Sequence, residues 1–434
     1  MNELVKITNV IKIASSAILG FSIDNPKLAT FSKTYTITIN GWLLEKNIPV
    51  LAMLLFNKNE IIRRVPINLP RPDIGEVYPD IVKAKTCGFS MVVSTLGMED
   101  NVELQVMALL QNQVQVHLAS ISLQRTAKLP FNYESIFQPL MVTSLGRSGS
   151  TWLMRVLAEH SNIIVHREYP YETHAAKYWI YSLFKVLSEP TNYLNPNAPA
   201  KHLSGLNIQW VRRNIIQDNL FNQWFTNNYI NQVVKFCKTS TDSFYSEVAK
   251  NQNQTPSQLT YFAEKFAPWK SITGLCYELY PQAKEIILVR DFRDTLCSML
   301  KFSEQRNVTD FGLNSNPTDL QAVKQIKNQA KRLLDYSQQR ADQACIIHYE
   351  NLVLKADETF LTILNYLNLE ANTKIVKNIL KKSATDTQEL KNHRTSKNPK
   401  KSIGRWQQDL NEPMKELCEE HLTKELQAFG YLEN

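Results

Sequence analysis

The sequence lacks long apolar runs, clustered cysteines and internal repeats. Its longest apolar stretches, at 49–56 and 286–289, fall far short of the ~18 residues that span a bilayer, so no membrane anchor is expected. The six cysteines are scattered, with the nearest pair 21 residues apart, which excludes a disulfide framework and the usual metal-binding spacings. These absences predict a protein of a reducing compartment, the cytoplasm.

A secretory leader is not expected either. Residues 13–21 are weakly apolar and follow two lysines, but Ser15 and Ser16 interrupt them and no A-x-A cleavage site follows. Apolar residues make up 43% and charged residues 21%, which is typical of a folded globular chain. A length of 434 residues predicts two or three domains. The net charge, 49 − 41 = +8, favours an anionic ligand.

The first 125 residues show the period-two alternation of β-strands. Residues 34–39 and 114–118 alternate β-branched and polar side chains, and proline-rich turn clusters at 69–75 and 78–80 separate such runs. We therefore predict an all-β sandwich domain over 1–125. The segment 41–90, from its Gly-Trp to its Gly-Phe-Ser, resembles β-sandwich modules that accompany bacterial glycan-modifying enzymes.

After a linker at 126–138, the pattern changes to that of a second domain, predicted over 139–434. An apolar strand at 140–144, a tight glycine loop and a helix at 151–160 form a β-loop-α unit. With a further strand at 285–289 this predicts an α/β fold, a parallel sheet flanked by helices. Helical periodicity continues at 319–340, 360–367 and 412–427, while the polar stretches 188–206 and 238–258 are predicted to be loops over a site.

The glycine loop has the composition of an anion-binding site. It lies where a strand ends and a helix begins, so free backbone N–H groups and the positive end of the helix converge there. Gly146 and Gly149 permit the turns, and Arg147 adds a forked cation. Hydroxyl donors come from Ser148, Ser150 and Thr151. The alternative is a surface turn with an incidental helix cap.

The loop differs from the P-loop of ATP- and GTP-binding proteins. That motif, G-x-x-x-x-G-K-[ST], needs a lysine that reaches the β- and γ-phosphates. Ser150 stands in the place of that lysine, and the basic residue comes earlier, at Arg147. The loop therefore keeps phosphate binding and argues against ordinary nucleotide hydrolysis.

At this loop the chain resembles the PAPS-dependent sulfotransferase superfamily, in which [RK]-S-G-[TS]-T cradles the 5′-phosphosulfate of 3′-phosphoadenosine 5′-phosphosulfate (PAPS). The resemblance implies a P-loop NTPase-like fold and a cofactor site at Arg147, Ser148, Gly149, Ser150, Thr151 and Trp152. The family's second element is a strand-end Arg followed eight residues later by Ser, which hold the 3′-phosphate. Arg290 and Ser298 match it, with Phe292 where the family usually has proline.

A third element near the C-terminus is strongly basic. Residues 397–406 hold three lysines and one arginine and resemble the family's late G-[KR]-W segment, which implies 3′-phosphate contacts for Gly404, Arg405 and Trp406. A solvated basic loop is the alternative. The sequence I-H-Y-E-N-L at 347–352 resembles the family's late strand, an element without a catalytic role. Arg293 and Asp294 are predicted to form structural charge pairs.

Sulfuryl transfer to a hydroxyl requires a base near the phosphate loop. In carbohydrate and tyrosylprotein branches of the family the base is a glutamate in an E-T-R or P-x-E context, which Glu172 fits best. Glu168 is the competitor, and His166 or His174 are further alternatives. Arg147 is predicted to stabilise the leaving oxygen. No metal is expected, because the spacing of His160, His166 and His174 matches no usual ligand set.

Together these motifs predict an enzyme that moves a sulfuryl group from PAPS to a hydroxyl or amine acceptor and releases adenosine 3′,5′-bisphosphate (PAP). The N-terminal module favours a carbohydrate or glycoconjugate acceptor, and nucleic acid is not expected as a partner. Two alternatives stay open: a nucleotide kinase-like P-loop enzyme, and a non-catalytic protein whose β-sandwich recognises a glycan or partner. The oligomeric state cannot be read from the sequence.

Overall fold

The computed structural model describes residues 3–433, apart from 33, 59, 130–132, 189–218, 269, 307–312, 314–316, 341–342, 385–394 and 397. The chain forms two compact units: Met1–Tyr133 with Ile180–Cys237, and Glu134–Trp179 with Lys238–Asn434. The domain boundaries inferred from the sequence, 1–125 and 139–434, remain a prediction.

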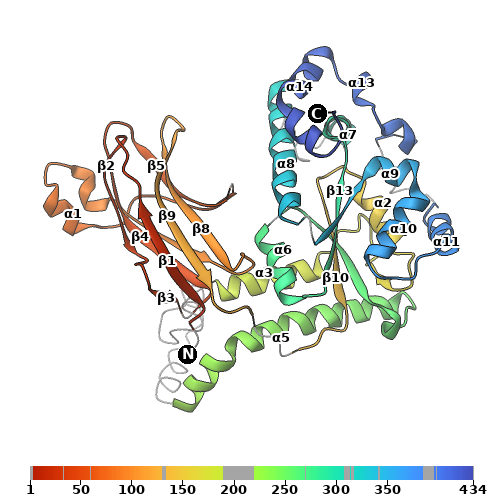
Figure 1. The fold of residues 1–434 in the computed structure, drawn as a ribbon, viewed down its shortest axis with the longest axis horizontal. Helices are drawn as coiled ribbons and strands as arrows, with labels where there is room; N and C mark the ends of the chain where they lie inside the picture. Colours follow the sequence, from red (N-terminus) through yellow and green to blue (C-terminus); the bar gives the residue numbers. More distant parts are fainter. Residues whose placement is uncertain are drawn as a thin grey trace. The chain divides into compact units, whose positions relative to one another are not determined.

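The N-terminal part of the first unit is built from antiparallel strands (Figure 1). Six of them form a sheet in the order β3-β1-β9-β8-β5-β6, and three form a second sheet in the order β2-β4-β7. Side chains alternate between buried and exposed along β8, which is the period-two pattern of a strand with one buried face. The predicted all-β N-terminal region is confirmed. Its elements are β1 Val5–Lys12, β2 Ile18–Asn25, β3 Phe31–Ser32, β4 Thr36–Glu45, β5 Val50–Asn57, β6 Glu60–Val65, α1 Pro72–Val77, β7 Gly88–Ser94, β8 Asn101–Leu110 and β9 Gln115–Arg125.

The second unit contains a five-stranded sheet in the order β11-β12-β10-β13-β14, with every pair parallel. The predicted parallel α/β fold is confirmed. Its strands are β10 Gln138–Ser144, β11 Ile163–Ile164, β12 Tyr261–Phe266, β13 Lys284–Val289 and β14 Ala344–His348. Its helices are α2 Ser150–Leu157, α3 Ala175–Leu187, α5 Asn219–Asn251, α6 Lys270–Leu279, α7 Phe292–Arg306, α8 Asp319–Gln339, α9 Tyr349–Leu354, α10 Ala356–Tyr366, α11 Thr373–Ser383, α13 Trp406–Asp409 and α14 Glu412–Ala428, of which α3 and α5 run on into the first unit.

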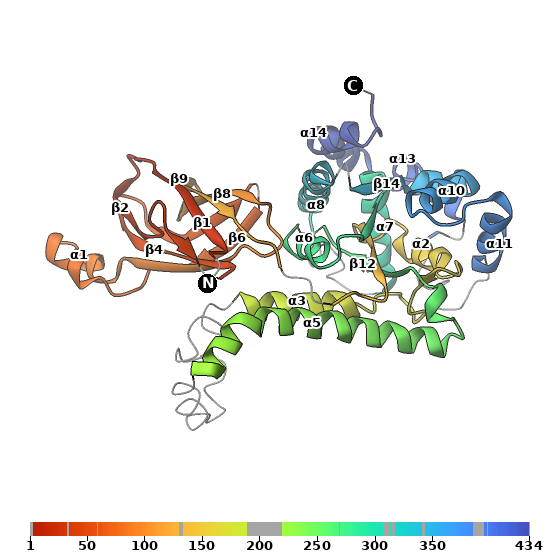
Figure 2. The same cartoon turned by 60° about the horizontal axis from the view of Figure 1, so that its bottom comes forward.

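Helices cover both faces of this sheet, as a parallel sheet requires. Along β13, Ile286 and Leu288 pack with α2, α9, α10 and α11, while Ile287 and Val289 pack with α7, α8 and α14. These two groups of helices lie on opposite sides of β13 in Figure 1. On the second face, Phe262 of β12 packs with α3 and α5, which Figure 2 shows side by side.

The strand order places a crevice at β10. Its neighbours β12 and β13 both follow it in the chain and lie on opposite sides of it. At such a switch point the two following connections leave in opposite directions, and ligands of open α/β sheets bind there, beyond the carboxyl ends of the strands. The glycine loop at 145–149 leaves β10 at this edge.

One prediction about loops is wrong. Residues 238–251 belong to the helix α5, not to a polar loop. The helix buries Val234, Cys237, Thr241, Tyr245 and Val248, spaced three or four residues apart on one face. The abundant Asn, Ser, Thr and Lys on its other positions hid this stripe in the sequence. The other predicted loop, 188–206, lies almost wholly outside the described residues.

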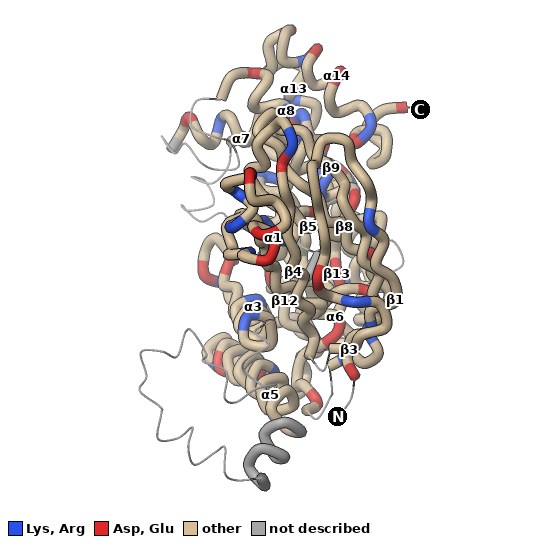
Figure 3. Tube along the Cα trace, turned by 90° about the vertical axis from the view of Figure 1, so that its left-hand side faces the viewer, with Lys and Arg blue, Asp and Glu red and all other residues tan. Residues whose placement is uncertain are grey.

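None of the described helices is long and apolar enough to cross a bilayer. Lys and Arg positions are interspersed with Asp and Glu along the Cα trace (Figure 3), so the net charge of +8 is not gathered into one segment on the face shown.

Candidate active site

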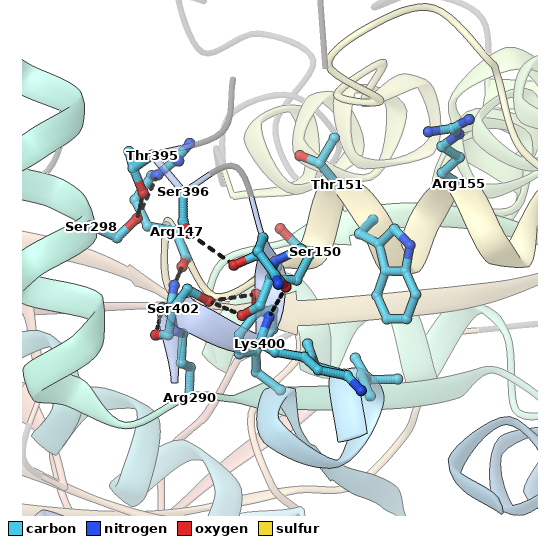
Figure 4. A pocket seen from close by; sticks show the side chains of 18 of the residues that line it. Arg147, Ser150, Thr151, Arg155, Arg290, Ser298, Thr395, Ser396, Lys400 and Ser402 are labelled. Carbon is cyan, nitrogen blue, oxygen red and sulfur yellow. Dashed lines mark hydrogen bonds between the residues drawn. The ribbon is translucent and has the colours of Figure 1, made fainter. Parts of the chain in front are cut away.

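The loop after β10 contains two residues with positive φ just before the helix α2 begins. Arg147 has φ 66° and Gly149 has φ 90°, and Gly149 is the N-cap of α2, its carbonyl accepting hydrogen bonds from the N–H groups of Trp152 and Leu153. The first N–H groups of a helix have no partner within it. Arg147, Ser150 and Thr151 line a cavity at this point (Figure 4), whereas Ser148 is buried and does not.

Gly149 is required by both its conformation and its surroundings. A Cβ at this position would lie 2.5 Å from Cδ2 of Tyr349 and would sit at a positive φ. We expect Gly149→Ala to lower Tm by about 5 °C or more, because a left-handed Cβ costs roughly 1–2 kcal/mol and the Tyr349 ring must also move. Thermal unfolding followed by circular dichroism measures this.

Gly404→Ala is the matched control. Gly404 also has a positive φ, 69°, but nothing lies within 4 Å of a Cβ built there. Its substitution should therefore cost only the backbone strain. Equal melting temperatures for the two variants would show that the contact with Tyr349 is unimportant.

Arg290, at the end of β13, connects the loop to the C-terminal region. Its Nη1 donates to the carbonyl oxygen of Arg147 (3.0 Å) and its Nη2 to that of Ser402 (2.7 Å), and its guanidinium lies over the Tyr349 ring. The side chain is buried, and Nε has no hydrogen-bond partner among the described residues. A buried donor without a partner is costly, so this atom is suited to a bound acceptor.

Ser298 stands on α7, eight residues after Arg290. Its Oγ accepts a hydrogen bond from Nε of Arg147 (3.3 Å) and is hydrogen-bonded to Oγ1 of Thr395 (3.1 Å). Arg405 in turn donates from Nη1 to Thr395 Oγ1 (3.1 Å). Two arginines and two hydroxyls therefore form one connected chain. Ser298 and Thr395 both line the cavity, on the side where Figure 4 shows Arg147.

The basic C-terminal segment reaches the cavity through residues 398–402, not through its G-R-W sequence. Lys400 and Ser402 line the cavity, whereas Gly404, Arg405 and Trp406 are not in its wall. Asp294 holds these three in place by accepting hydrogen bonds from the N–H groups of Gly404 (2.7 Å) and Trp406 (3.0 Å). Burial raises the pKa of Asp294 to about 6. Lys397 lies outside the described residues.

The neighbouring Arg293 has a structural role. It forms a buried ion pair with Asp291 (2.7 Å) and stacks on the Trp406 ring. Phe292, the residue in the usual proline position, is buried and packs edge to face on Phe429. This departure from the family pattern therefore serves packing against the end of α14 and leaves Arg290 at the cavity.

A carboxylate and a buried lysine meet beside the helix N-terminus. Lys265, on β12, donates from Nζ to Oε1 of Glu172 (3.0 Å), to Oγ1 of Thr151 (2.8 Å) and to the carbonyl oxygen of Pro170 (2.7 Å). The side chains of Lys265, Glu172 and Thr151 all line the cavity. Burial lowers the pKa of Lys265 despite the adjacent carboxylate. Glu172 is half exposed, at 50% of its side-chain surface, so solvent or an acceptor reaches it.

The competing bases lie elsewhere. The Glu168 side chain is 76% exposed, and its Oε2 lies 3.9 Å from Nε2 of His166. It is not part of the cavity wall. His166 shares a hydrogen bond with Thr173 through Nδ1 (2.6 Å), and burial lowers the pKa of His174. Neither histidine lines the cavity. Within the described ranges, no three side chains of His, Cys, Asp or Glu form a group that could hold a metal ion.

The cavity measures about 380 Å³ and is strongly cationic. Five basic side chains line it and Glu172 is its one carboxylate among the described residues. The basic residues are Arg147, Arg155, Lys265, Arg290 and Lys400. Its lining also includes the apolar side chains of Trp152, Leu352, Val353 and Ala356. This arrangement fits a ligand with several negative charges and one flat apolar part.

Among the residues of this wall that sequence reasoning missed are Lys265, Tyr349 and Arg155. Lys265 carried a detectable signal, since a Glu-Lys pair interrupts an otherwise apolar six-residue segment at 261–266, and charged residues are rarely buried without a reason. Tyr349 belongs to the Y-E-N-L sequence that was assigned no catalytic role. Its ring covers Gly149 and Arg290, which only the fold brings together.

Comparisons with known proteins identify one family. Residues 139–373, more than half of the chain, match the Sulfotransferase family. A Caenorhabditis elegans protein that carries a protein-tyrosine sulfotransferase name is 29% identical over 149 residues, 34% of this chain and 53% of the relative. Protein-tyrosine sulfotransferase 1 of Danio rerio is 32% identical over 111 residues, 25% of this chain and 28% of the relative.

The chain thus spans about half, or less, of the length of these curated relatives. Among solved structures, the sulfotransferase domain from the curacin biosynthetic pathway has 13% sequence identity and a TM-score of 0.38, covering 66% of this chain and 98% of that domain. On the family match over 139–373, the chain belongs to the sulfotransferase family.

Proposed function

We propose that the protein transfers a sulfuryl group from PAPS to a hydroxyl acceptor. The observation that carries this proposal is the meeting of Glu172, Lys265 and Thr151 at the N-terminus of α2, inside a cavity otherwise lined by cations. A carboxylate that reaches solvent can accept the acceptor's proton. The lysine and the helix N-terminus can stabilise the negative charge that develops on the donor side.

The described residues fit this donor. The 5′-side would be held by the N-terminal amides of α2 with Ser150 and Thr151, and the 3′-phosphate by Arg290, Ser298 and Lys400. Support comes from the partnerless Nε of Arg290 and from the place of Ser298 and Lys400 in the cavity wall. Trp152 and Leu352 provide an apolar surface for an adenine.

When bound, PAPS supplies the sulfuryl group, whose bond to the 5′-phosphate breaks as the bond to the acceptor oxygen forms. Glu172 takes the acceptor's proton, so that the attacking oxygen becomes a better nucleophile. Lys265 lies between Glu172 and Thr151 and neutralises charge on the transferred group and the leaving oxygen. Arg147, stacked on Phe302 at 4.2 Å, adds a second cation. These side chains provide the charge stabilisation without a metal ion.

The acceptor class stays a prediction. The N-terminal module favours a carbohydrate or glycoconjugate, while the names of the two curated relatives make a peptide tyrosine the alternative. Both present a hydroxyl to Glu172. A panel of oligosaccharides and tyrosine peptides, incubated with radiolabelled PAPS, separates these classes by which product carries the label.

The proposed donor is tested by titration calorimetry of the full chain with PAP and, separately, with ATP and magnesium. We expect micromolar or tighter binding of PAP and at least ~100-fold weaker binding of ATP, because Ser150 replaces the P-loop lysine and Arg290 is placed for a 3′-phosphate. Firm ATP binding without PAP binding would overturn the proposal in favour of a kinase-like enzyme. PAP binding without any sulfuryl transfer would favour a non-catalytic protein.

A further inference from the structure

Two consecutive residues of β12 hold one segment from opposite faces of the sheet. Successive side chains of a strand point to opposite faces. Lys265 faces α2, where it contacts Thr151, and Glu264 faces α3 and α5. The segment between β11 and α3, residues 165–174, carries Glu172 and passes around this edge of the sheet.

Glu264 is bonded to the start of α3 by its carboxylate. Its Oε1 accepts hydrogen bonds from the N–H of Ala176 (2.7 Å) and the hydroxyl of Tyr245 (2.5 Å), and its Oε2 accepts one from the N–H of Lys177 (3.1 Å). The side chain is buried, with only 2% of the residue exposed. Each oxygen accepts from a backbone N–H group, which can only donate, so an ionised carboxylate, which accepts on both oxygens, satisfies these partners best.

Lys265 holds the same segment four to seven residues earlier in the chain. Its Nζ donates to the carbonyl oxygen of Pro170 and to the Glu172 carboxylate. The segment is therefore fixed at 170–172 from one face of β12 and at 176–177 from the other. If the hydrogen bonds of either Lys265 or Glu264 were lost, the segment that contains Glu172 would be held at one end only.

We infer that Glu264 is a positioning residue, whose ionised carboxylate holds the N-terminus of α3 and thereby places Glu172 for proton transfer. The role given to Glu172 rests on the proposed function, whereas the hold on α3 rests on hydrogen bonds alone. A displacement of about 1 Å at a reacting group can cost of the order of 100-fold in rate. Among the described residues, the hydrogen-bond partners of the Glu264 side chain are Ala176, Lys177 and Tyr245, and none of them lines the cavity.

The surroundings of Glu264 make this hold sensitive to pH. Burial raises its pKa to about 7, while the hydrogen bonds from Tyr245, Ala176 and Lys177 and the charge of Lys177 lower it. Other ionisable groups on this face are Tyr280, which interacts with Tyr245, and Lys238 and Asp242 of α5. The ammonium of Lys238 lies 5.2 Å from the Tyr280 ring, and the buried carboxyl group of Asp242 accepts a hydrogen bond from the N–H of Ile136. Protonation of Glu264 removes one hydrogen-bond acceptor, so its hydrogen bonds to the start of α3 weaken as the pH falls through about 7.

Glu264→Gln keeps the shape and removes the charge, placing an NH₂ group against N–H or O–H donors. We expect kcat to fall by about 10- to 100-fold while the Kd for PAP, measured by calorimetry, stays within about 3-fold. Hydrogen exchange read by mass spectrometry should accelerate in peptides covering 166–178. In the wild type, kcat should rise as the pH increases through about 7. This rising limb of the pH profile should be absent in Glu264→Gln.

Tyr245→Phe tests independently whether the pH dependence of the rate follows the pKa of Glu264. The tyrosine hydroxyl lowers the pKa of Glu264, so its removal should move the activity limb to higher pH. A shift to lower pH, or none, contradicts the inference. A purely structural loss would change Tm without moving the limb.

Glu285→Gln is the matched control. Glu285, on β13, is also buried. Among the described residues its side chain accepts from the hydroxyls of Thr143, Tyr277 and Tyr336, which can rotate to suit an amide, and none of these partners belongs to 165–177. It should leave kcat and exchange at 166–178 unchanged. If Glu264→Gln matches wild type in kcat and exchange, or if both variants lose equally, the inference is wrong. If wild type itself transfers no sulfuryl group, the proposed function fails, yet the exchange result still decides whether Glu264 holds this segment.

Discussion

Glu172→Gln is expected to lower kcat by about 10²- to 10⁴-fold, the usual contribution of a general base. The amide cannot take the acceptor's proton, and it weakens the hydrogen bond from Lys265, which is 3.0 Å away in the native chain. Because Glu172 does not contact Arg290 or Ser298 in the described residues, the Kd for PAP should remain within about 3-fold. Initial rates with saturating PAPS, together with calorimetry on PAP, measure both quantities.

Glu168→Gln is the control for this prediction. It is the same chemical change four residues earlier, at a side chain that is 76% exposed and outside the cavity wall. It should leave kcat within about 2-fold. A large loss in Glu168→Gln with little loss in Glu172→Gln would reverse the assignment of the base.

Arg290→Ala is expected to weaken PAP binding by about 10- to 100-fold. Hydrogen bonds to a charged partner contribute about 1.5–3 kcal/mol each, and every 1.4 kcal/mol is about tenfold in Kd. The change also removes the two donors that connect the carbonyls of Arg147 and Ser402, so the glycine loop and the C-terminal segment lose their common contact. Calorimetric titration with PAP measures the effect.

Comparison of Arg290→Lys with Arg293→Lys separates the forked geometry from the charge. Both arginines are buried, at 5% and 6% exposure, and both changes keep a positive charge. Lysine lacks the planar fork and should still weaken PAP binding at 290 by about tenfold. At 293 the side chain pairs with Asp291, outside the cavity wall, so PAP binding should change by less than about 3-fold. Equal losses at both positions would argue for a general structural effect.

The glycine loop was predictable because all its information is local. A strand, two glycines, hydroxyl residues and an arginine stand within one short stretch, and a helix N-terminus needs no distant residue to present its amides. The pairing of Arg290 with Ser298 is local as well, since both belong to one strand-helix turn. The parallel α/β fold followed from the same alternation of apolar strands and helices.

Elements with mixed composition were harder to predict. The buried stripe of α5 is spread among polar residues over 33 positions, so its average composition suggested a loop. The strand β12 was missed because Glu264 and Lys265 interrupt its apolar run, although both are buried. Their burial depends on partners from α2, α3 and α5 that the sequence does not place nearby.

The chain's own sequence determined its class: a parallel α/β unit after an all-β region, a glycine loop without the P-loop lysine, and Arg290 and Ser298 eight residues apart on one strand-helix unit. Only the tertiary structure decided which glutamate meets that loop and which cation meets the glutamate. Glu168 and Glu172 are alike in composition and lie on one connection. The parallel pairing of β12 beside β10 brings Lys265 to Thr151, and this contact between residues 114 positions apart selects Glu172.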